Sequence, residues 1–392
     1  MVNSTSESPL SIYLHIPFCT TKCTYCAFNT YTNLERLIPE FVQALCREIE
    51  IVARSNPYVG VGTVYFGGGT PSLLQPGHFS QILASLQAGF TINADAEITA
   101  EVNPNDITPD YAAALRMAGL NRISMGMQSA NQNELDLFAR RHNVDTVHRA
   151  FEDLRRARFD NISLDLIYGF PYQTLASWEH SLQEAIDLQP EHVSLYALGL
   201  EEGTPMEAWV RRGKLPIPDD DLAADMYDLA TERLAVAGFE QYEISNWGRA
   251  GRFSQHNLQY WRNLPYVGLG PGAHGFAGGV RYATILSPQR YIRSMQNTDG
   301  NHTFPRTPAT DTAETVGQAQ EIAETLMMSL RLTSEGVDLE GFQRRFGINL
   351  FDIHGDTLHR FVEQGLLQIT DNRIRLTTEG RLLSNIVFRE LV

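Results

Sequence analysis

Three cysteines, Cys19, Cys23 and Cys26, lie close together in the run HIPFCTTKCTYCAFN, with the spacing C-x3-C-x2-C. A closed structural zinc site takes four ligands, so three thiolates on one short loop match it poorly. Cysteine thiolates are the usual ligands of iron–sulfur clusters. A cube of four irons that is bound by three cysteines keeps one iron open for a further ligand. The motif therefore predicts a [4Fe–4S] cluster on a reactive loop, and the alternative is a group of cysteines without a cluster.

Regular structure must hold this loop, and the surrounding sequence alternates between short apolar runs and amphipathic runs. Helical patterns such as PEFVQALCREIEIVARS and VHRAFEDLRRA separate the apolar runs. Strands that alternate with helices indicate βα units and a parallel sheet. We therefore predict an α/β fold with six βα units, either an open barrel or a doubly wound sheet. The strand candidates, which are rich in Ile, Val, Leu and Tyr, are 11–18, 63–69, 97–104, 121–129, 161–169 and 192–200.

Polar residues at the ends of these strands favour the barrel. Gly67–Thr70, Glu101, Gln128 and Asp165 all fall at the carboxyl ends of their strands. That rim carries the active site in (β/α) barrels. Each residue alone also fits a turn or a helix cap. Together with the cysteine loop they predict a partial (β/α)6 barrel with a functional site at one rim.

The sequence divides into four parts. Residues 1–10 are expected to form a flexible tail and 11–235 the barrel. Residues 236–311 hold one connecting strand, FEQYEISNW, and an ordered loop rich in glycine and aromatic residues. Residues 312–392 read as a mainly helical domain with a hairpin that turns at Asp-Asn and a final helix. Three helices and a hairpin resemble a winged helix.

Charge and cysteine content restrict the class of protein. The net charge is −15, from 31 basic and 46 acidic residues, so we expect no nucleic-acid partner. The alternative that a winged helix suggests is a DNA-binding regulator. Beyond the motif, the sequence has one further cysteine, Cys46, in a helical pattern, and this indicates no disulfide framework and a reducing cytoplasm. The first residues do not resemble a signal peptide, and no apolar run is long enough to predict a membrane span.

Motifs outside the cysteine loop point to a family. YLHIPFC, YFGGGTPS, AEVNP, RISMGMQS, LDLIYGFP and GLGPGAHG extend from Tyr13 toward the C-terminal helices. With CTTKCTYC they resemble the radical S-adenosylmethionine (SAM) superfamily and, within it, the oxygen-independent coproporphyrinogen III oxidase group. The resemblance implies that the three cysteines hold the cluster and that its open iron chelates the amino and carboxylate groups of SAM. It also implies that an electron from the reduced cluster cleaves SAM to a 5′-deoxyadenosyl radical.

The same resemblance implies a SAM site on the rim. Glu101 would accept hydrogen bonds from the SAM ammonium, and Asp165 would bind the ribose hydroxyls. Arg140 would pair with the SAM carboxylate, with Arg141 as the alternative. Ala197 would supply a backbone contact, and simple packing is its alternative role. The full set of implied SAM contacts is Tyr13, Tyr25, Gly68, Gly69, Thr70, Glu101, Gln128, Arg140, Asp165 and Ala197.

The group contains oxidases, which decarboxylate two propionates of coproporphyrinogen III, and heme chaperones. Phe28 stands where the oxidases have a further cysteine, and only eighteen residues precede Cys19, where the oxidases have a long extension. HNLQYW at 256–261 matches the HNxxYW motif of the chaperones. We therefore expect a heme chaperone, with an oxidase that makes protoporphyrinogen IX as the alternative, and the sequence leaves open whether the protein is an enzyme.

HNLQYW also suggests a heme site. His256 would ligate the heme iron, and Tyr260 and Trp261 would pack on the porphyrin face. A structural histidine is the alternative for His256, and His274 is a second candidate ligand. The expected partners are a heme-accepting protein, which can be membrane-associated, and a reductant for the cluster.

Overall fold

The computed structural model describes residues 9–58, 60–296 and 302–391. The expected tail therefore lies outside the described residues as far as position 8, and Leu10 already begins the first strand. The barrel strands are β1 (Leu10–Ile16), β2 (Val61–Gly68), β3 (Ile92–Val102), β4 (Arg122–Gln128), β5 (Ile162–Tyr168) and β6 (His192–Ala197). The helices between and after them are α1 (Ile38–Arg54), α2 (Pro76–Gly89), α3 (Pro109–Ala118), α4 (Gln132–Leu137), α5 (Val144–Arg156), α6 (Leu175–Asp187), α7 (Pro205–Arg211) and α8 (Asp220–Val236).

Local sequence signals fix where several of these helices begin and end. Thr108, Asn143 and Thr174 each accept a hydrogen bond from the backbone N–H three residues later, so they cap α3, α5 and α6. Gly119 ends α3 with a φ of +109°, a conformation that favours glycine. These caps set the helix ends, and one or two helices lead from each of the strands β1 to β5 to the next parallel strand.

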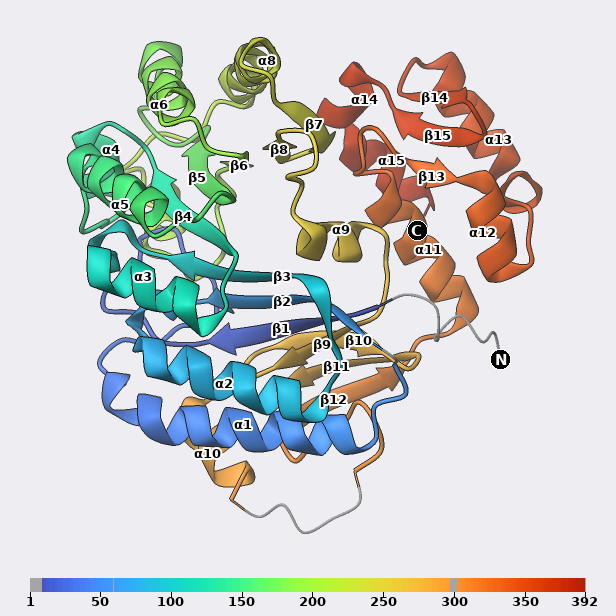
Figure 1. Cartoon of the computed structure of the whole chain (residues 1–392). Coiled ribbons are helices and arrows are strands. Elements are labelled where there is room, and N and C mark those ends of the chain that lie inside the picture. Colours follow the sequence, from blue (N-terminus) through green and yellow to red (C-terminus); the bar gives the residue numbers. More distant parts are fainter. Residues whose placement is uncertain (1–8, 59, 297–301, 392) are drawn as a thin grey trace.

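Within the described residues, one sheet has the strand order β12-β11-β10-β9-β1-β2-β3-β4-β5-β6-β8-β7. Strands β1 to β6 pair in parallel with their sequence neighbours. Figure 1 shows these strands in an arc, with α1, α2, α3, α5 and α6 on its outer side. The predicted α/β class and partial (β/α)6 barrel are therefore confirmed. The strand ends that carry the predicted site all lie on one edge of the arc.

The segment that follows the barrel differs from the prediction. The single expected strand FEQYEISNW is a hairpin of β7 (Glu240–Glu243) and β8 (Asn246–Gly248). The expected ordered loop contains α9 (Gln255–Trp261), β9 (Tyr266–Leu269) and β10 (His274–Ala277). These elements are too short to show a period in the sequence. Their glycines also do not indicate a strand in the sequence. Gly268 is nevertheless needed where β9 meets β10, because a Cβ there would lie 1.9 Å from the backbone oxygen of His274.

Strand β9 pairs in parallel with β1 and extends the sheet beyond the six predicted units. The sheet continues through β10 and β11 (Val280–Thr284), followed by α10 (Pro288–Ser294) and β12 (Thr310–Thr315). Strand β12 crosses position 312, where the sequence suggested that the helical domain begins, because it pairs with β11 in the main sheet.

The C-terminal domain combines helices with a small sheet of order β13-β15-β14. Asp371 and Asn372 both have positive φ values, as a two-residue hairpin turn requires, so the predicted hairpin corresponds to β14 and β15. No helix among the described residues has the length and apolar character needed to cross a membrane. The elements are α11 (Gln318–Ser329), β13 (Val337–Asp338), α12 (Leu339–Phe346), α13 (Leu350–Glu363), β14 (Leu367–Thr370), β15 (Arg373–Leu376), α14 (Thr378–Leu382) and α15 (Ser384–Leu391).

Candidate functional site

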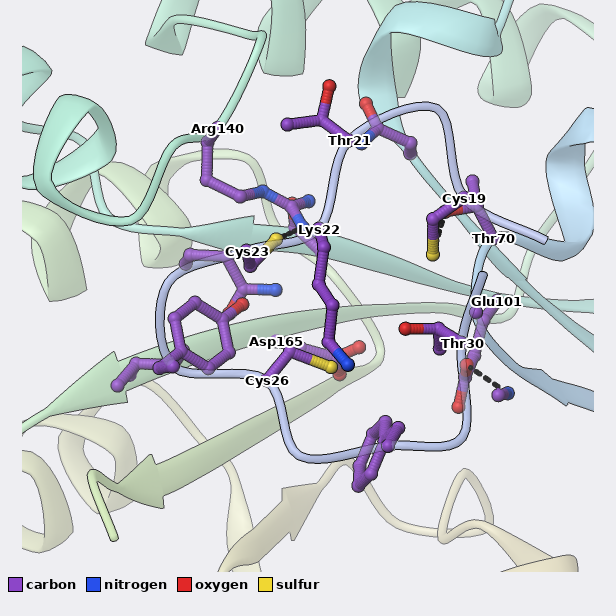
Figure 2. A pocket seen from close by; sticks show the side chains of 18 of the residues that line it. Cys19, Thr21, Lys22, Cys23, Cys26, Thr30, Thr70, Glu101, Arg140 and Asp165 are labelled. Atoms are coloured by element: carbon purple, nitrogen blue, oxygen red, sulfur yellow. Dashed lines mark hydrogen bonds between the residues drawn. The ribbon is translucent and has the colours of Figure 1, made fainter. Parts of the chain in front are cut away.

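A cavity of about 700 Å³ opens at the carboxyl ends of the barrel strands. The cysteine loop forms one wall, and the strand ends form the rest. In the close view, Arg140 and Glu101 lie on opposite sides of this loop (Figure 2). The sequence-predicted residues that line the cavity are Cys19, Cys23, Cys26, Tyr25, Gly68, Gly69, Thr70, Glu101, Gln128, Arg140, Asp165 and Ala197.

Backbone hydrogen bonds fix the cysteine loop at its base and its middle. The N–H of Cys19 donates to the Tyr31 oxygen at 3.0 Å, and the N–H of Tyr31 donates to the Pro17 oxygen at 2.7 Å. Halfway along, the Thr24 hydroxyl donates to the Leu137 oxygen at 2.7 Å. These hydrogen bonds anchor the loop through groups other than the thiols.

The three thiols point toward the cavity from separate places on the loop. The Thr70 hydroxyl donates to Cys19 Sγ at 3.5 Å, and Arg140 Nη1 donates to Cys23 Sγ at 3.6 Å. Among the described residues, no three His, Cys, Asp or Glu side chains are gathered as one metal ion would require. A cluster of four irons binds each cysteine at a different iron. The separated thiols and the neighbouring arginine therefore fit an anionic cluster better than a single ion.

Two glycines at the end of β2 allow this strand to pack against the cysteine loop. Gly68 has a φ of +112°, and a Cβ there would lie 2.5 Å from the His15 ring. A Cβ on Gly69 would lie 2.6 Å from the Phe18 oxygen and 3.1 Å from Cys19 Sγ. A larger residue at Gly69 would push the loop away, and one at Gly68 would displace the His15 ring of β1, so glycine is required at both positions.

Glu101 is held by hydrogen bonds to both of its carboxylate oxygens. The Tyr65 hydroxyl donates to Oε1 at 3.0 Å, and the Gly68 N–H donates to Oε2 at 3.1 Å. Burial and the neighbouring Asp165 carboxyl raise the pKa of Glu101 to about 7. A cationic group in the cavity would lower the pKa of Glu101 again, because it would stabilise the ionised carboxylate.

The other charged positions lie at different depths. Arg140 donates to the Gly126 oxygen at 2.9 Å and reaches into the cavity beside Cys23, whereas Arg141 pairs with Asp106 at 3.3 Å and is partly exposed. Both oxygens of Asp165 accept from the Ser124 hydroxyl at 3.0 Å, and burial raises the pKa of this carboxyl. The geometry therefore makes Arg140 the deeper of the two arginines.

Backbone strain marks one further position. Gln128 has a φ of +66° at the end of β4, next to a register shift against β5. A non-glycine residue rarely adopts this conformation, and here it accompanies a side chain that lines the cavity.

Three aromatic residues show what the sequence did and did not reveal. Tyr25 packs edge-on against Phe138 with 5.0 Å between ring centres and lines the cavity. Tyr13 does not line it; its hydroxyl shares a hydrogen bond of 3.0 Å with His15 Nδ1. Tyr65, which the sequence analysis missed, does line it. Strand alternation was the available signal, because Tyr65 lies two residues before Gly67 on the same face.

The HNLQYW motif forms α9, which does not contribute to this cavity. His256 is 1% exposed, and its Nδ1 bonds the Thr63 hydroxyl at 2.7 Å while its Nε2 bonds the Tyr260 hydroxyl at 2.9 Å. Burial and the charge of Arg122 lower the pKa of His256 to about 3. Both ring nitrogens thus have protein partners, which is the arrangement of the structural alternative. The guanidinium of Arg331 lies 4.5 Å from the Trp261 ring centre.

Known proteins resemble this chain over nearly its whole length. Residues 13–185 match the model of the radical SAM superfamily, and 317–383 match that of the HemN C-terminal domain. The chain is 34% identical to "Heme chaperone HemW" of Bacillus subtilis over 379 residues, which cover 96% of this chain and 98% of the relative. It is 36% identical to the protein of the same name from Mycobacterium tuberculosis (strain H37Rv), covering 98% and 95%. The chain belongs to the HemW family.

The HemW family shares its fold with an oxidase. The solved structure of coproporphyrinogen III oxidase (HemN) from Escherichia coli superposes with a TM-score of 0.81 at 24% identity and covers 98% of this chain and 90% of that one. The two family models and the curated relatives confirm the resemblance to the radical SAM superfamily and to the coproporphyrinogen III oxidase group. Since fold does not fix function, the shared architecture alone does not separate the two activities of the group.

Proposed function

We propose that this chain is a heme chaperone that binds heme and passes it to an acceptor protein, on a scaffold that holds a [4Fe–4S] cluster and SAM. The observation that supports the proposal most is the identity, over nearly the full length, to bacterial relatives named heme chaperones. The proposal includes two partners, a heme-accepting protein and a reductant for the cluster.

The donor set of the cysteine loop supports the cluster. Cys19, Cys23 and Cys26 would hold it, and the Arg140 guanidinium would offset part of its negative charge. When bound, the cluster and SAM together supply one-electron chemistry. The role of this chain is to fix the three thiols and to let the loop pack closely against the end of β2 at Gly69.

The charges on the cavity wall support the SAM assignment. Glu101 would bind the ammonium, Arg140 the carboxylate and Asp165 the ribose hydroxyls. These groups surround one cavity of about 700 Å³, a volume within the range of small-molecule sites. The remaining contacts with SAM would come from Tyr25, Gly68, Gly69, Thr70, Gln128 and Ala197. Tyr13 does not line the cavity, so it would support the site without contacting SAM.

Heme ligation by His256, with Tyr260 and Trp261 beside the porphyrin, remains part of the proposal and has a structural requirement. His256 would have to exchange one of its hydrogen bonds, to Thr63 or to Tyr260, for the iron. Such an exchange costs about 1 kcal/mol per bond. α9 would therefore have to shift before heme could bind there, whereas the exposed His274 could bind without such a shift.

A heme titration and a turnover assay on the same preparation test this function. We expect heme to produce a saturable Soret band with the reconstituted protein, and we expect no consumption of coproporphyrinogen III when SAM and a reductant are supplied. Turnover together with a heme spectrum that does not saturate would overturn the chaperone assignment and favour the oxidase. Phe28, which is 65% exposed on the cysteine loop, stands where the oxidases have a further cysteine.

A further inference from the structure

Helix α9 lies inside the arc of strands, toward their amino ends (Figure 1), and none of its residues lines the cavity. The buried Glu97 of β3 holds its first turn, since Oε2 accepts from the Gln255 N–H at 3.1 Å and Oε1 accepts from the His256 N–H at 3.0 Å. The Thr63 hydroxyl, which bonds His256, also donates to Ser11 of β1 at 2.6 Å. Strands β3 and β2 thus hold the start of α9 directly, and β1 supports it through Thr63; we call α9 the floor helix.

The floor helix is in contact with the residue that holds Glu101. The His256 ring stacks on the Tyr65 ring with 4.9 Å between centres and 21° between planes. Tyr13 stacks near the same ring, at 6.2 Å and 22°. Because two neighbouring rings restrict the rotation of Tyr65, its hydroxyl has a fixed direction, and that direction leads to Glu101 Oε1 at 3.0 Å.

Strand geometry explains why one strand can make both contacts. Thr63, Tyr65 and Gly67 alternate along β2 and share its inner face. Thr63 at the lower level binds His256, and Tyr65 at the next level binds Glu101. Gly67 follows at the rim, where a Cβ would lie 2.9 Å from both tyrosine rings and 3.2 Å from Glu101 Oε1. Glycine at this place therefore leaves room for the carboxylate and for Tyr65.

We propose that Tyr65 is a positioning residue for the ligand-binding carboxylate of Glu101, and that the HNLQYW helix orients Tyr65 through the ring of His256. The ligand class is the one that the proposed function assigns to Glu101, an amine-bearing sulfonium such as SAM, and the inference rests on that assignment. The motif thereby supports the SAM site in the absence of heme.

The decisive variant is Tyr65→Phe, which keeps the stacked ring and removes only the hydroxyl that donates to Glu101. Calorimetric titration of SAM into heme-free, reconstituted protein is expected to show a loss of affinity of about tenfold. In a Glu101→Gln background the same change is expected to cost less than twofold, because the carboxylate that the hydroxyl orients is gone. Tyr58→Phe is the matched control, since its hydroxyl bonds the distant Gly278 N–H.

His256→Ala tests the second step. This variant is expected to bind SAM several-fold more weakly and to keep normal iron content. In the His256→Ala background, Tyr65→Phe is expected to lower the affinity for SAM less than it does in the wild-type protein. Should His256→Ala fail to fold, Thr63→Val, which removes one bond to the ring, takes its place. Unchanged affinity in Tyr65→Phe, or an equal loss with and without Glu101, overturns the inference. If the wild-type protein does not bind SAM, the proposed function itself fails, so the two failures can be told apart.

Discussion

The rim of the barrel and its floor are built from the same strands, and each buries a titratable side chain. At the rim, Glu101 has its pKa raised to about 7, and its carboxylate faces the cavity. At the floor, His256 has its pKa lowered to about 3, and the protein occupies both of its ring nitrogens. Burial shifts both groups toward their neutral forms. The difference is that only the rim residue faces space that a ligand can fill, so a perturbed pKa by itself does not identify a binding residue.

The largest effect that we expect at the rim is loss of the cluster when one of its cysteines is replaced. Cys23→Ala leaves two thiolates on the loop, and we expect anaerobic reconstitution to give no stable [4Fe–4S] cluster. Cys46, in α1, is the matched control, and Cys46→Ala should retain full iron content. Iron analysis and the visible charge-transfer band measure both. A Cys23→Ala protein that keeps its iron and its band would remove the cluster from the loop.

The next effect concerns the carboxylate at the rim. Glu101→Ala removes a charged hydrogen-bond acceptor worth roughly 1.5–3 kcal/mol, so SAM binding should weaken on the order of tenfold to a hundredfold. Calorimetry on reconstituted protein measures this loss. Glu340→Ala, an exposed site on α12, is the control and should bind SAM as the wild type does. Equal affinities for the Glu101→Ala and wild-type proteins would exclude Glu101 from the site.

Acidity should distinguish the rim from the floor. A bound ammonium favours ionised Glu101, whose pKa is about 7 without ligand, so SAM affinity should fall as the pH drops below 7. The expected loss is about tenfold between pH 8 and pH 6, with release of a proton on binding. Asp165 and the Tyr65 hydroxyl are the titratable groups that act on this carboxyl. Glu101→Gln should flatten the profile, and an unaltered slope in that variant would assign the proton elsewhere.

A heme titration tests whether the buried floor residue His256 can bind a ligand. If His256 ligates heme iron, His256→Ala should shift the Soret band and weaken heme binding several-fold, while iron–sulfur content stays normal. That result would require the floor to open, because the ring nitrogens are otherwise bonded. His359→Ala, at an exposed position of α13, is the control. A spectrum that responds to His274→Ala and ignores His256→Ala would assign the heme ligand to β10 instead of α9.

The smallest expected effect sharpens the description of the rim. Arg141 is partly exposed and its pair with Asp106 is worth about 0–1 kcal/mol, so Arg141→Ala should change SAM affinity less than twofold. Arg140→Ala should weaken SAM binding more strongly, because its guanidinium is buried in the cavity wall. The two affinities, measured side by side by calorimetry, decide between them. The reverse order would assign the SAM carboxylate to Arg141.

Local patterns were enough to predict the rim. Each βα unit carries its own signal, and parallel strands bring their carboxyl ends to one edge, so the sequence alone places Glu101 and Asp165 together. The floor could not be predicted in this way. The contacts of His256 come from Thr63 and Glu97, which are 193 and 159 residues away, and nothing local encodes them. Tyr65 was missed because an aromatic residue in a strand usually indicates core packing.

The hydrogen bonds that anchor the cysteine loop have a consequence for the proposed cluster. Its base is closed by Cys19, Tyr31 and Pro17, and Thr24 ties its middle to Leu137, all through groups other than the thiols. Ordering a free loop of this length would cost on the order of 1–2 kcal/mol per residue. The hydrogen bonds at the base and the middle of the loop offset part of that cost, so less of the loop would be left for a bound cluster to order.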